Sequence, residues 1–401
     1  MLALFLTVFI DLVGFGIIIP FLPFFAEHFA ASPDVVTLLI AVFPLTQFLF
    51  APLWGRLSDR MGRKPVLLMT LAGLFASYIW LGLSQGLWML FAARAFAGAM
   101  AGNIAVAQAY VADVTPSERR AEGLGRIGAA FGLGFLLGPA IGGVLAGPDP
   151  QNPNILLPAL AAAAMTATAF CFALAFLKET VGADVRAEAK GAPPVNRIAL
   201  MTEALRRPRL GVLLAMLFLL PFTFSGLEST LALWTEREFG WGAQQNGYVY
   251  SYLGLIAVVT QGGLIGPLTR HLGEKRLLVL GPALIGLGFV LVPLAPALFL
   301  TLAGFGLVVL GISIASPTIY SLISQQAGRD ERGRLLGVAQ STASLARIAG
   351  PAWAGFCFVT FGRDWPYFVA AALMVVMLVL GLKAGGAKGA RAKDREQTPR
   401  G

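Results

Sequence analysis

The stretch that decides the fold is Gly55-Arg-Leu-Ser-Asp59-Arg60-Met-Gly62-Arg63-Lys64-Pro65, a short polar segment between two long apolar runs. Its glycines allow a tight turn, and Pro65 suits the first turn of a following helix. Asp59 can face a helix N-terminus or a basic partner, so it could hold one conformation closed. The basic residues alone could instead serve only to set the side of a membrane. The segment is therefore interpreted as a tight connection between two membrane helices, with Asp59, Arg60 and Arg63 as candidate gating residues.

The composition around this loop indicates an integral membrane protein. Of 401 residues, 57% are hydrophobic and only 13% are charged, and the mean hydropathy is +0.75. A soluble globular chain has about 25% charged residues, so too little polar surface remains for a soluble enzyme, a disordered chain or a secreted disulfide scaffold. The chain has only two cysteines and two histidines. We therefore expect no metal site and no cofactor.

Twelve apolar runs are long enough to cross a bilayer. A hydrocarbon core of about 30 Å needs roughly 20 apolar residues in a helix, and strand-like alternation is absent from the runs. The runs lie near residues 2–25, 34–54, 65–84, 87–112, 121–146, 154–177, 210–234, 244–269, 276–295, 297–322, 335–360 and 365–383. The first is interpreted as a spanning helix rather than a signal peptide, because it lacks a basic beginning and Asp11 interrupts it. The sequence thus predicts an all-α integral membrane fold of twelve transmembrane helices.

The basic residues predict how these helices are oriented. Most of the 30 Lys and Arg residues lie in alternate connections and in the C-terminal tail, whereas Arg237 and Arg363 lie on the opposite side. The positive-inside rule then places both termini in the cytoplasm and the protein, multi-pass, in the inner (plasma) membrane. This asymmetry accounts for the net charge of +9, so no nucleic-acid partner is expected.

The sequence repeats itself in two halves. Gly62 recurs as Gly273, Gly125 as Gly337, Gly138-Pro139 as Gly350-Pro351 and Glu118-Arg119 as Glu331-Arg332, at offsets of 211 to 213 residues. This predicts two six-helix pseudo-repeats: a bundle at 1–177, a cytoplasmic linker at 178–209, a second bundle at 210–383 and a basic tail at 384–401. In such duplicated transporters the substrate site lies near the midplane, between the repeats.

The fourth and fifth predicted helices have further unusual residues. The fourth contains Arg94, Asn103 and Gln108 and ends with Asp113, a candidate for the gate. The fifth reads Gly132-Leu-Gly134-Phe-Leu-Leu-Gly138-Pro139-Ala-Ile-Gly142-Gly143, with glycines every four residues and a proline that bends the helix. Such a face allows close helix packing, which alone could explain it. Alternatively, Gly138 and Pro139 belong to the gate.

Together, the 55–65 loop, Arg94 and the Gly138-Pro139 helix resemble the major facilitator superfamily, and within it the twelve-helix drug:proton antiporters that include the tetracycline exporters. The resemblance implies a major facilitator fold, proton-coupled drug efflux and antibiotic resistance. The chain differs from the tetracycline exporters in two places. Ala76, Ser77 and Tyr78 stand where those relatives have an acidic residue in helix three, and residues 277–293 contain no carboxylate. A broader range of apolar or cationic drugs is therefore as compatible as tetracycline.

Charges within the membrane are functional candidates by default, because they are costly in hydrocarbon. Four are present: Asp11, Arg94, Glu228 and Arg347. Asp11 could alternate between protonated and ionised forms, with Arg94 approaching and withdrawing, or it could make a structural hydrogen bond to a neighbouring helix. Glu228 could be a second proton site or could lie near the outer water layer. The predicted proton-coupling residues are Asp11, Arg94 and Glu228.

Candidate substrate ligands are the polar and aromatic residues of the same helices: Asn103, Gln108, Phe224, Glu228, Gln340 and Arg347. The leading prediction is a proton-coupled exporter of small apolar or cationic compounds, acting as a monomer, with protons and membrane lipid as its other partners. The alternative is a symporter or uptake carrier for a metabolite or organic anion, bound by Arg94 or Arg347. An enzyme or channel is disfavoured because no catalytic constellation is present.

Overall fold

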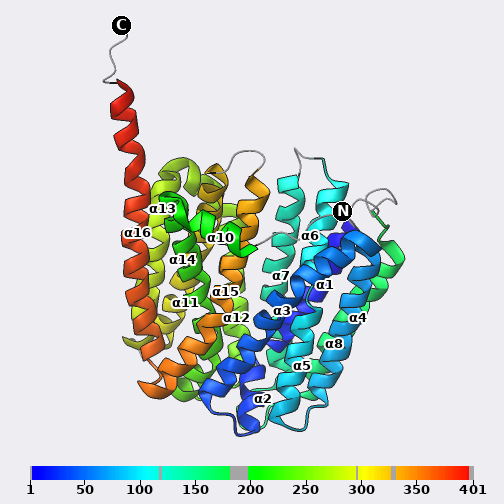
Figure 1. Cartoon of the computed structure of the whole chain (residues 1–401). Helices are drawn as coiled ribbons and strands as arrows, with labels where there is room; N and C mark the ends of the chain where they lie inside the picture. The colour runs from blue at the N-terminus through cyan, green and yellow to red at the C-terminus, as the bar shows by residue number, and fades with distance from the viewer. Residues whose placement is uncertain (1, 117–119, 181–196, 295–296, 327–330, 397–401) are drawn as a thin grey trace. The chain divides into compact units, whose positions relative to one another are not determined.

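The computed structural model describes residues 2–116, 120–180, 197–294, 297–326 and 331–396, and every regular element within these ranges is a helix (Figure 1). Ten stretches within them are long and apolar enough to cross a membrane. One of these, Ala243–Leu294, contains two of the predicted runs. The predicted run 335–360 is also helical, but its polar residues keep it outside this set of ten. The predicted all-α membrane fold is confirmed.

The first six runs form eight helices, because two of the runs are broken. Their bounds are α1 Leu2–Ile18, α2 Leu22–His28, α3 Pro33–Met61, α4 Arg63–Gly82, α5 Leu87–Met100, α6 Asn103–Val114, α7 Arg120–Ala146 and α8 Leu156–Phe176. The first break contains Pro20, which lacks a backbone donor. The second lies at Ala101 and Gly102, whose backbone N–H groups donate to Gly98 and Met100 instead of to residues four positions earlier.

The second six runs form longer helices, and a short helix precedes them. The elements are α10 Arg197–Arg206, α11 Pro208–Phe239, α12 Ala243–Val259, a π-helical turn η2 Thr260–Leu264, α13 Ile265–Leu294, α14 Leu298–Gln325, α15 Arg332–Thr360 and α16 Trp365–Glu396. Pro221 and Pro351 lie inside α11 and α15. Much of the predicted linker, 181–196, and the end of the predicted tail, 397–401, lie outside the described residues.

The chain divides into two compact units. Unit 1 comprises the described parts of 1–194 with 226–258 and 348–363, and unit 2 comprises 195–225, 259–347 and 364–401. Three helical stretches therefore have residues in both units: α11, the continuous run from α12 to α13, and α15. The predicted division into bundles at 1–177 and 210–383 with a linker stays a prediction, because each compact unit combines residues from both halves of the sequence.

In unit 1, α1 lies against α7 and α8, and α4 lies against α8 and α5 (Figure 1). Leu4, Val8 and Leu12 place one side of α1 in the apolar core. Because lipid is as apolar as these side chains, close packing rather than water exclusion holds such helices together. This arrangement buries the middle of α1, where Asp11 lies.

The predicted repeat has a counterpart in the backbone. Gly62, between α3 and α4, has a φ of 109°, and Gly273, at the kink within α13, has a φ of 75°. Both values lie in the left-handed region that favours glycine. The two halves therefore use the same residue type and a similar turn at matching positions, consistent with two pseudo-repeats.

Candidate functional site

Asp11 is buried in the middle of α1 and accepts hydrogen bonds from two other helices. The Asn103 side-chain amide of α6 donates to Oδ2, and Thr166 Oγ1 of α8 donates to Oδ1 at 3.3 Å. The side chain is only 4% exposed. Asn103, predicted as a substrate ligand, is thus engaged with the acid. Both partners are neutral side chains, which can hydrogen-bond to a carboxylate or to a neutral carboxyl group.

Arg94 is also buried, but it lies over an aromatic ring. Its guanidinium carbon is 4.6 Å from the centroid of Phe43, and its Nε has no hydrogen-bond partner. Within the described residues, no ion pair joins Arg94 to Asp11. This conformation therefore lacks the close contact between the two residues that the sequence predicts for one of two states. Glu228 of α11 does act electrostatically on Arg94. Two of the predicted proton-coupling residues, from different halves of the sequence, thus lie within electrostatic range of each other.

Glu228 lies in a polar part of α11 within unit 1. Its side chain is half-buried, and its backbone carbonyl accepts a hydrogen bond from Tyr250 Oη of α12 at 2.9 Å. About two turns further on, the buried Thr235 Oγ1 donates to Asn246 Oδ1 of α12 at 2.8 Å. These contacts hold the part of α11 that bears Glu228 against α12.

The glycine face of α7 packs directly on the helix that bears Asp11. A Cβ added at Gly138 would lie 2.6 Å from the carbonyl oxygen of Val13 and 2.7 Å from Cα of Gly16. On another side of α7, Gly143 meets Gly247 of α12 backbone to backbone. Helix α7 is therefore wedged between α1 and α12 with almost no side-chain space, as small-residue helix interfaces allow.

The 55–65 loop forms an ion-pair cluster centred on Arg63. Its Nη1 is 2.5 Å from Asp59 Oδ1, its Nε is 2.8 Å from Asp113 Oδ2, and its backbone N–H donates to Glu179 Oε1 at 2.9 Å. The structure thus places three of the predicted gating residues together. Arg60, the fourth charged candidate, is exposed.

A second ion-pair cluster lies at the opposite ends of unit 1 helices, and the sequence analysis did not identify it. Arg237 Nη2 contacts Glu27 Oε1 at 2.9 Å, and Arg363 donates both to the Arg237 carbonyl and to Glu238. Three segments distant in sequence meet here. Only the isolated position of Arg237 and Arg363 among the predicted outer connections could have signalled it.

The remaining substrate candidates are more widely placed. Gln108, Gln340 and Arg347 are exposed, and Phe224 is half-buried. Tyr320 Oη lies 3.5 Å from Gln340 Oε1, at the limit of a hydrogen bond. Thr166 and Phe43, which contact Asp11 and Arg94, were missed because neither has a charge or a motif.

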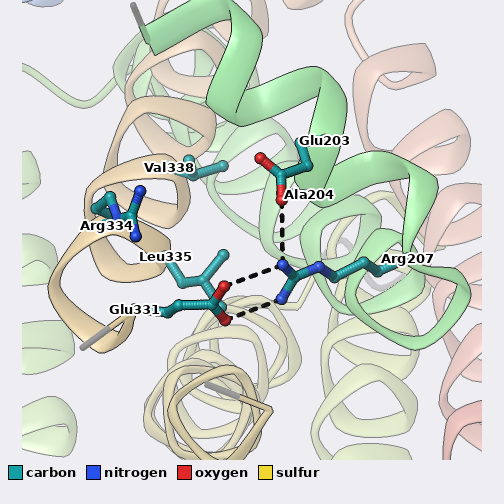
Figure 2. A pocket seen from close by; sticks show the side chains of 7 residues that line it. All are labelled: Glu203, Ala204, Arg207, Glu331, Arg334, Leu335 and Val338. Carbon is teal, nitrogen blue, oxygen red and sulfur yellow. Dashed lines mark hydrogen bonds and ion pairs between the residues drawn. The ribbon is translucent and has the colours of Figure 1, made fainter. Parts of the chain in front are cut away.

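Helix α10 is tied to the start of α15 by one arginine (Figure 2). Arg207 contacts Glu331 through two bonds, at 3.1 and 3.2 Å, and Glu203 of α10 at 3.1 Å. The hydrogen bond and charge of Arg207 lower the pKa of Glu331 below its ordinary value, and Glu331 in turn raises the pKa of Arg207. The Glu331 carboxylate is thus favoured in its ionised form.

The docking of α10 should therefore weaken at low pH. A depressed carboxylate pKa stabilises the contact above the ordinary pKa, and that stabilisation is lost as pH falls through the lowered value. We expect the protection factors of the α10 amides, which are exchange rates corrected for their intrinsic pH dependence, to stay high from pH 7 to about 5 and to fall below about 4. Glu331→Gln should show fast exchange already at pH 7. Glu203→Gln, which leaves the two-bond contact intact, should not; equal exchange in the wild type and Glu331→Gln would contradict the prediction.

Comparison of the chain with known proteins identifies its family. The family model described as Major Facilitator Superfamily matches residues 4–351, with a second match over 262–400. The chain belongs to the Major Facilitator Superfamily. It is a multi-pass membrane transporter and not an enzyme.

Its relatives include drug-resistance proteins. The tetracycline resistance protein of class E from Escherichia coli is 31% identical, with 93% of this chain and 92% of the relative covered. Multidrug resistance protein 2 of Bacillus subtilis (strain 168) is 28% identical over 93% of this chain and 92% of its own. Among solved structures, the human organic anion transporter MFSD10 (TETRAN) has a TM-score of 0.70 and 26% identity, covering 94% of this chain and 98% of that one.

Proposed function

We propose that the protein is a proton-coupled antiporter that exports small apolar or cationic drugs. The observation that supports this most is Asp11, a carboxyl group buried within a membrane helix, whose hydrogen-bond partners among the described residues are the neutral side chains of Asn103 and Thr166. An acid in such a place is a common proton site in transporters. The drug-resistance relatives favour a drug as the exported compound.

In this proposal, export proceeds by alternating access. Substrate enters from the cytoplasm or inner leaflet while Asp11 is ionised, and a proton from outside then neutralises Asp11 and favours release of the substrate. Glu228 acts electrostatically on Arg94, and the proposal assigns both residues to the coupling of proton and substrate movement. The loss of a charge in hydrocarbon lowers the cost of the conformational change, so proton movement can drive transport.

The cluster around Arg63 is proposed as the cytoplasmic gate. Asp59→Asn removes one of the two carboxylates on Arg63 but leaves Asp113 in place. Because partly exposed ion pairs contribute roughly 0.2–1 kcal/mol, we expect turnover to fall by up to about fivefold with little loss of substrate affinity. Transport rates over a range of substrate concentrations would check this. An unchanged maximal rate would remove Asp59 from the gate.

The function is tested with purified protein in liposomes that contain a pH-sensitive dye, under an imposed proton gradient. Tetracycline, a lipophilic cation, an organic anion and a sugar are added in turn. We expect tetracycline or the cation to move protons in the direction opposite to the drug. Proton flow in the same direction as any substrate would establish a symporter and overturn the antiport proposal.

A second candidate is a carrier of organic anions. The buried Arg94 has one nitrogen without a hydrogen-bond partner, and the similar human structure is titled an organic anion transporter. Such a nitrogen could donate to a carboxylate of a substrate. The organic anion in the panel distinguishes this candidate, because it alone should then be transported and Arg94→Gln should weaken its binding.

The orientation and the functional unit are part of the same proposal. The charge distribution favours cytoplasmic termini, and a single chain contains both pseudo-repeats, so a monomer is expected to suffice. Protons, the exported compound and the surrounding lipid are the proposed partners.

A further inference from the structure

An open hollow of about 650 Å³ lies at one end of the unit 2 helices. Residues of α11, α13, α14 and α16 form its wall. The charged groups are Arg209, Arg270, Lys275, Arg276 and a single carboxylate, Glu274, with His271 beside them. Leu213, Leu278 and Leu322 contribute apolar wall. The hollow therefore combines a concentration of positive charge with an apolar surface.

The pseudo-repeat explains why this hollow is basic. Residues 266–276 correspond to the 55–65 loop at an offset of 211, and Gly62 and Lys64 are kept as Gly273 and Lys275. The charges that neutralise the first loop are not kept. Arg270 stands at the position of Asp59, and Gln325, at an offset of 212, stands at that of Asp113. The second copy of the turn thus has the backbone of the gate without its acidic partners.

The one carboxylate in the hollow is bonded to neutral side chains rather than to Arg270, Lys275 or Arg276. Glu274 accepts hydrogen bonds from Ser321 Oγ at 2.6 Å and from Gln325 Nε2 at 2.9 and 3.1 Å. Within the part of the chain that the structure describes, neither Arg270, Lys275 nor Arg276 forms an ion pair with a carboxylate. Their exposed side chains therefore leave a positive potential, which a concave surface concentrates.

We propose that this hollow binds the phosphate group of an anionic phospholipid. Arginine and lysine donate several charge-assisted hydrogen bonds to phosphate oxygens. The leucines of the wall suit the start of an acyl chain, which a water-soluble anion would not need. Basic pockets between transmembrane helices on the cytoplasmic side recognise such head groups. The position at the ends of spanning helices, on the side predicted to be cytoplasmic, matches the depth of a lipid head group.

The test measures lipid binding to the full-length protein in detergent, by native mass spectrometry, with phosphatidylglycerol and phosphatidylcholine. The variant Arg270→Gln, Lys275→Gln, Arg276→Gln removes three cations of the hollow. The control Arg56→Gln, Arg126→Gln, Lys178→Gln removes three cations from unit 1. Size-exclusion chromatography checks that each variant is folded.

We expect phosphatidylglycerol to bind in preference to phosphatidylcholine. Each cation near a lipid surface contributes about fivefold to affinity, so the hollow variant should lose roughly hundredfold and the control should keep its affinity. Equal losses in both variants would show a diffuse charge effect and overturn the site. Displacement of the lipid by millimolar inorganic phosphate would show a soluble-anion site and overturn the lipid assignment. Drug transport plays no part in this readout, so failure of the proposed function would not affect it.

Discussion

Asp11→Asn should reduce substrate-driven proton flux to that of liposomes without protein, and the variant should still fold. The substituted amide keeps an oxygen that accepts a hydrogen bond from Asn103 or Thr166, and it is similar in size. The amide does not change its protonation state at any accessible pH. An acid that couples transport is therefore lost, whereas a purely structural acid would be largely replaced.

The measurement compares dye-reported proton flux and binding of tetracycline or a lipophilic cation in the same preparation. The matched control is Asp149→Asn, which changes a carboxylate whose contacts are with Gln151 and Asn152 of its own loop. The control should transport at the wild-type rate. Full coupled transport by Asp11→Asn would exclude this residue as the proton site and leave Glu228 as the next candidate.

Gly138→Ala should produce a large loss of stability, because α7 has almost no side-chain space where it packs on α1. The added Cβ would lie 2.6 Å from the Val13 carbonyl oxygen and 2.7 Å from Cα of Gly16, and backbone on a packed helix cannot rotate away. Helices α1 and α7 would have to separate. Overpacking of this kind costs about 1–3 kcal/mol, and the displacement of α1 would also move Asp11.

The control for this variant lies on the same helix. A Cβ at Gly128 would have no atom of another element within 4 Å, so Gly128→Ala should be neutral or slightly stabilising, since alanine favours a helix. The unfolding midpoint in detergent and the transport rate would be measured for both. Equal midpoints for the two variants would show that the α1–α7 contact is not as tight as the structure has it.

The helices were predictable because their signal is local. A run of about 20 apolar residues is sufficient to identify a membrane span, and all twelve runs are helical in the structure. The interruptions were less accessible. Pro20 is visible in the sequence, whereas the break at Ala101–Gly102 lies where Gly102 packs closely on Trp54 of α3, which hydropathy does not report. The π-turn Thr260–Leu264 lies within an apolar run and has no signal in hydropathy.

The candidate site was predictable only residue by residue. The cost of burying a charge singled out Asp11, Arg94 and Glu228. Their partners were not foreseen, because Asn103 and Thr166 lie 92 and 155 residues from Asp11. The contact of Arg94 with an aromatic ring, Phe43, was not foreseen either, and the predicted approach and withdrawal of Arg94 at Asp11 stays a prediction. Charge and spacing identify such groups, whereas their pairing requires the three-dimensional arrangement of helices.

Three helical stretches belong to both units, and this has a mechanical consequence. A helix with residues in both units has to bend if one unit moves and the other does not. Any such movement is therefore absorbed within α11, the α12–α13 run and α15. Each has a weak point close to the boundary: Pro221 in α11, the π-turn at Thr260–Leu264 and Pro351 in α15. Prolines and π-turns are where helices kink. We expect the helices to bend at these three points when the transporter changes conformation, and we expect their stiffness to limit the turnover rate.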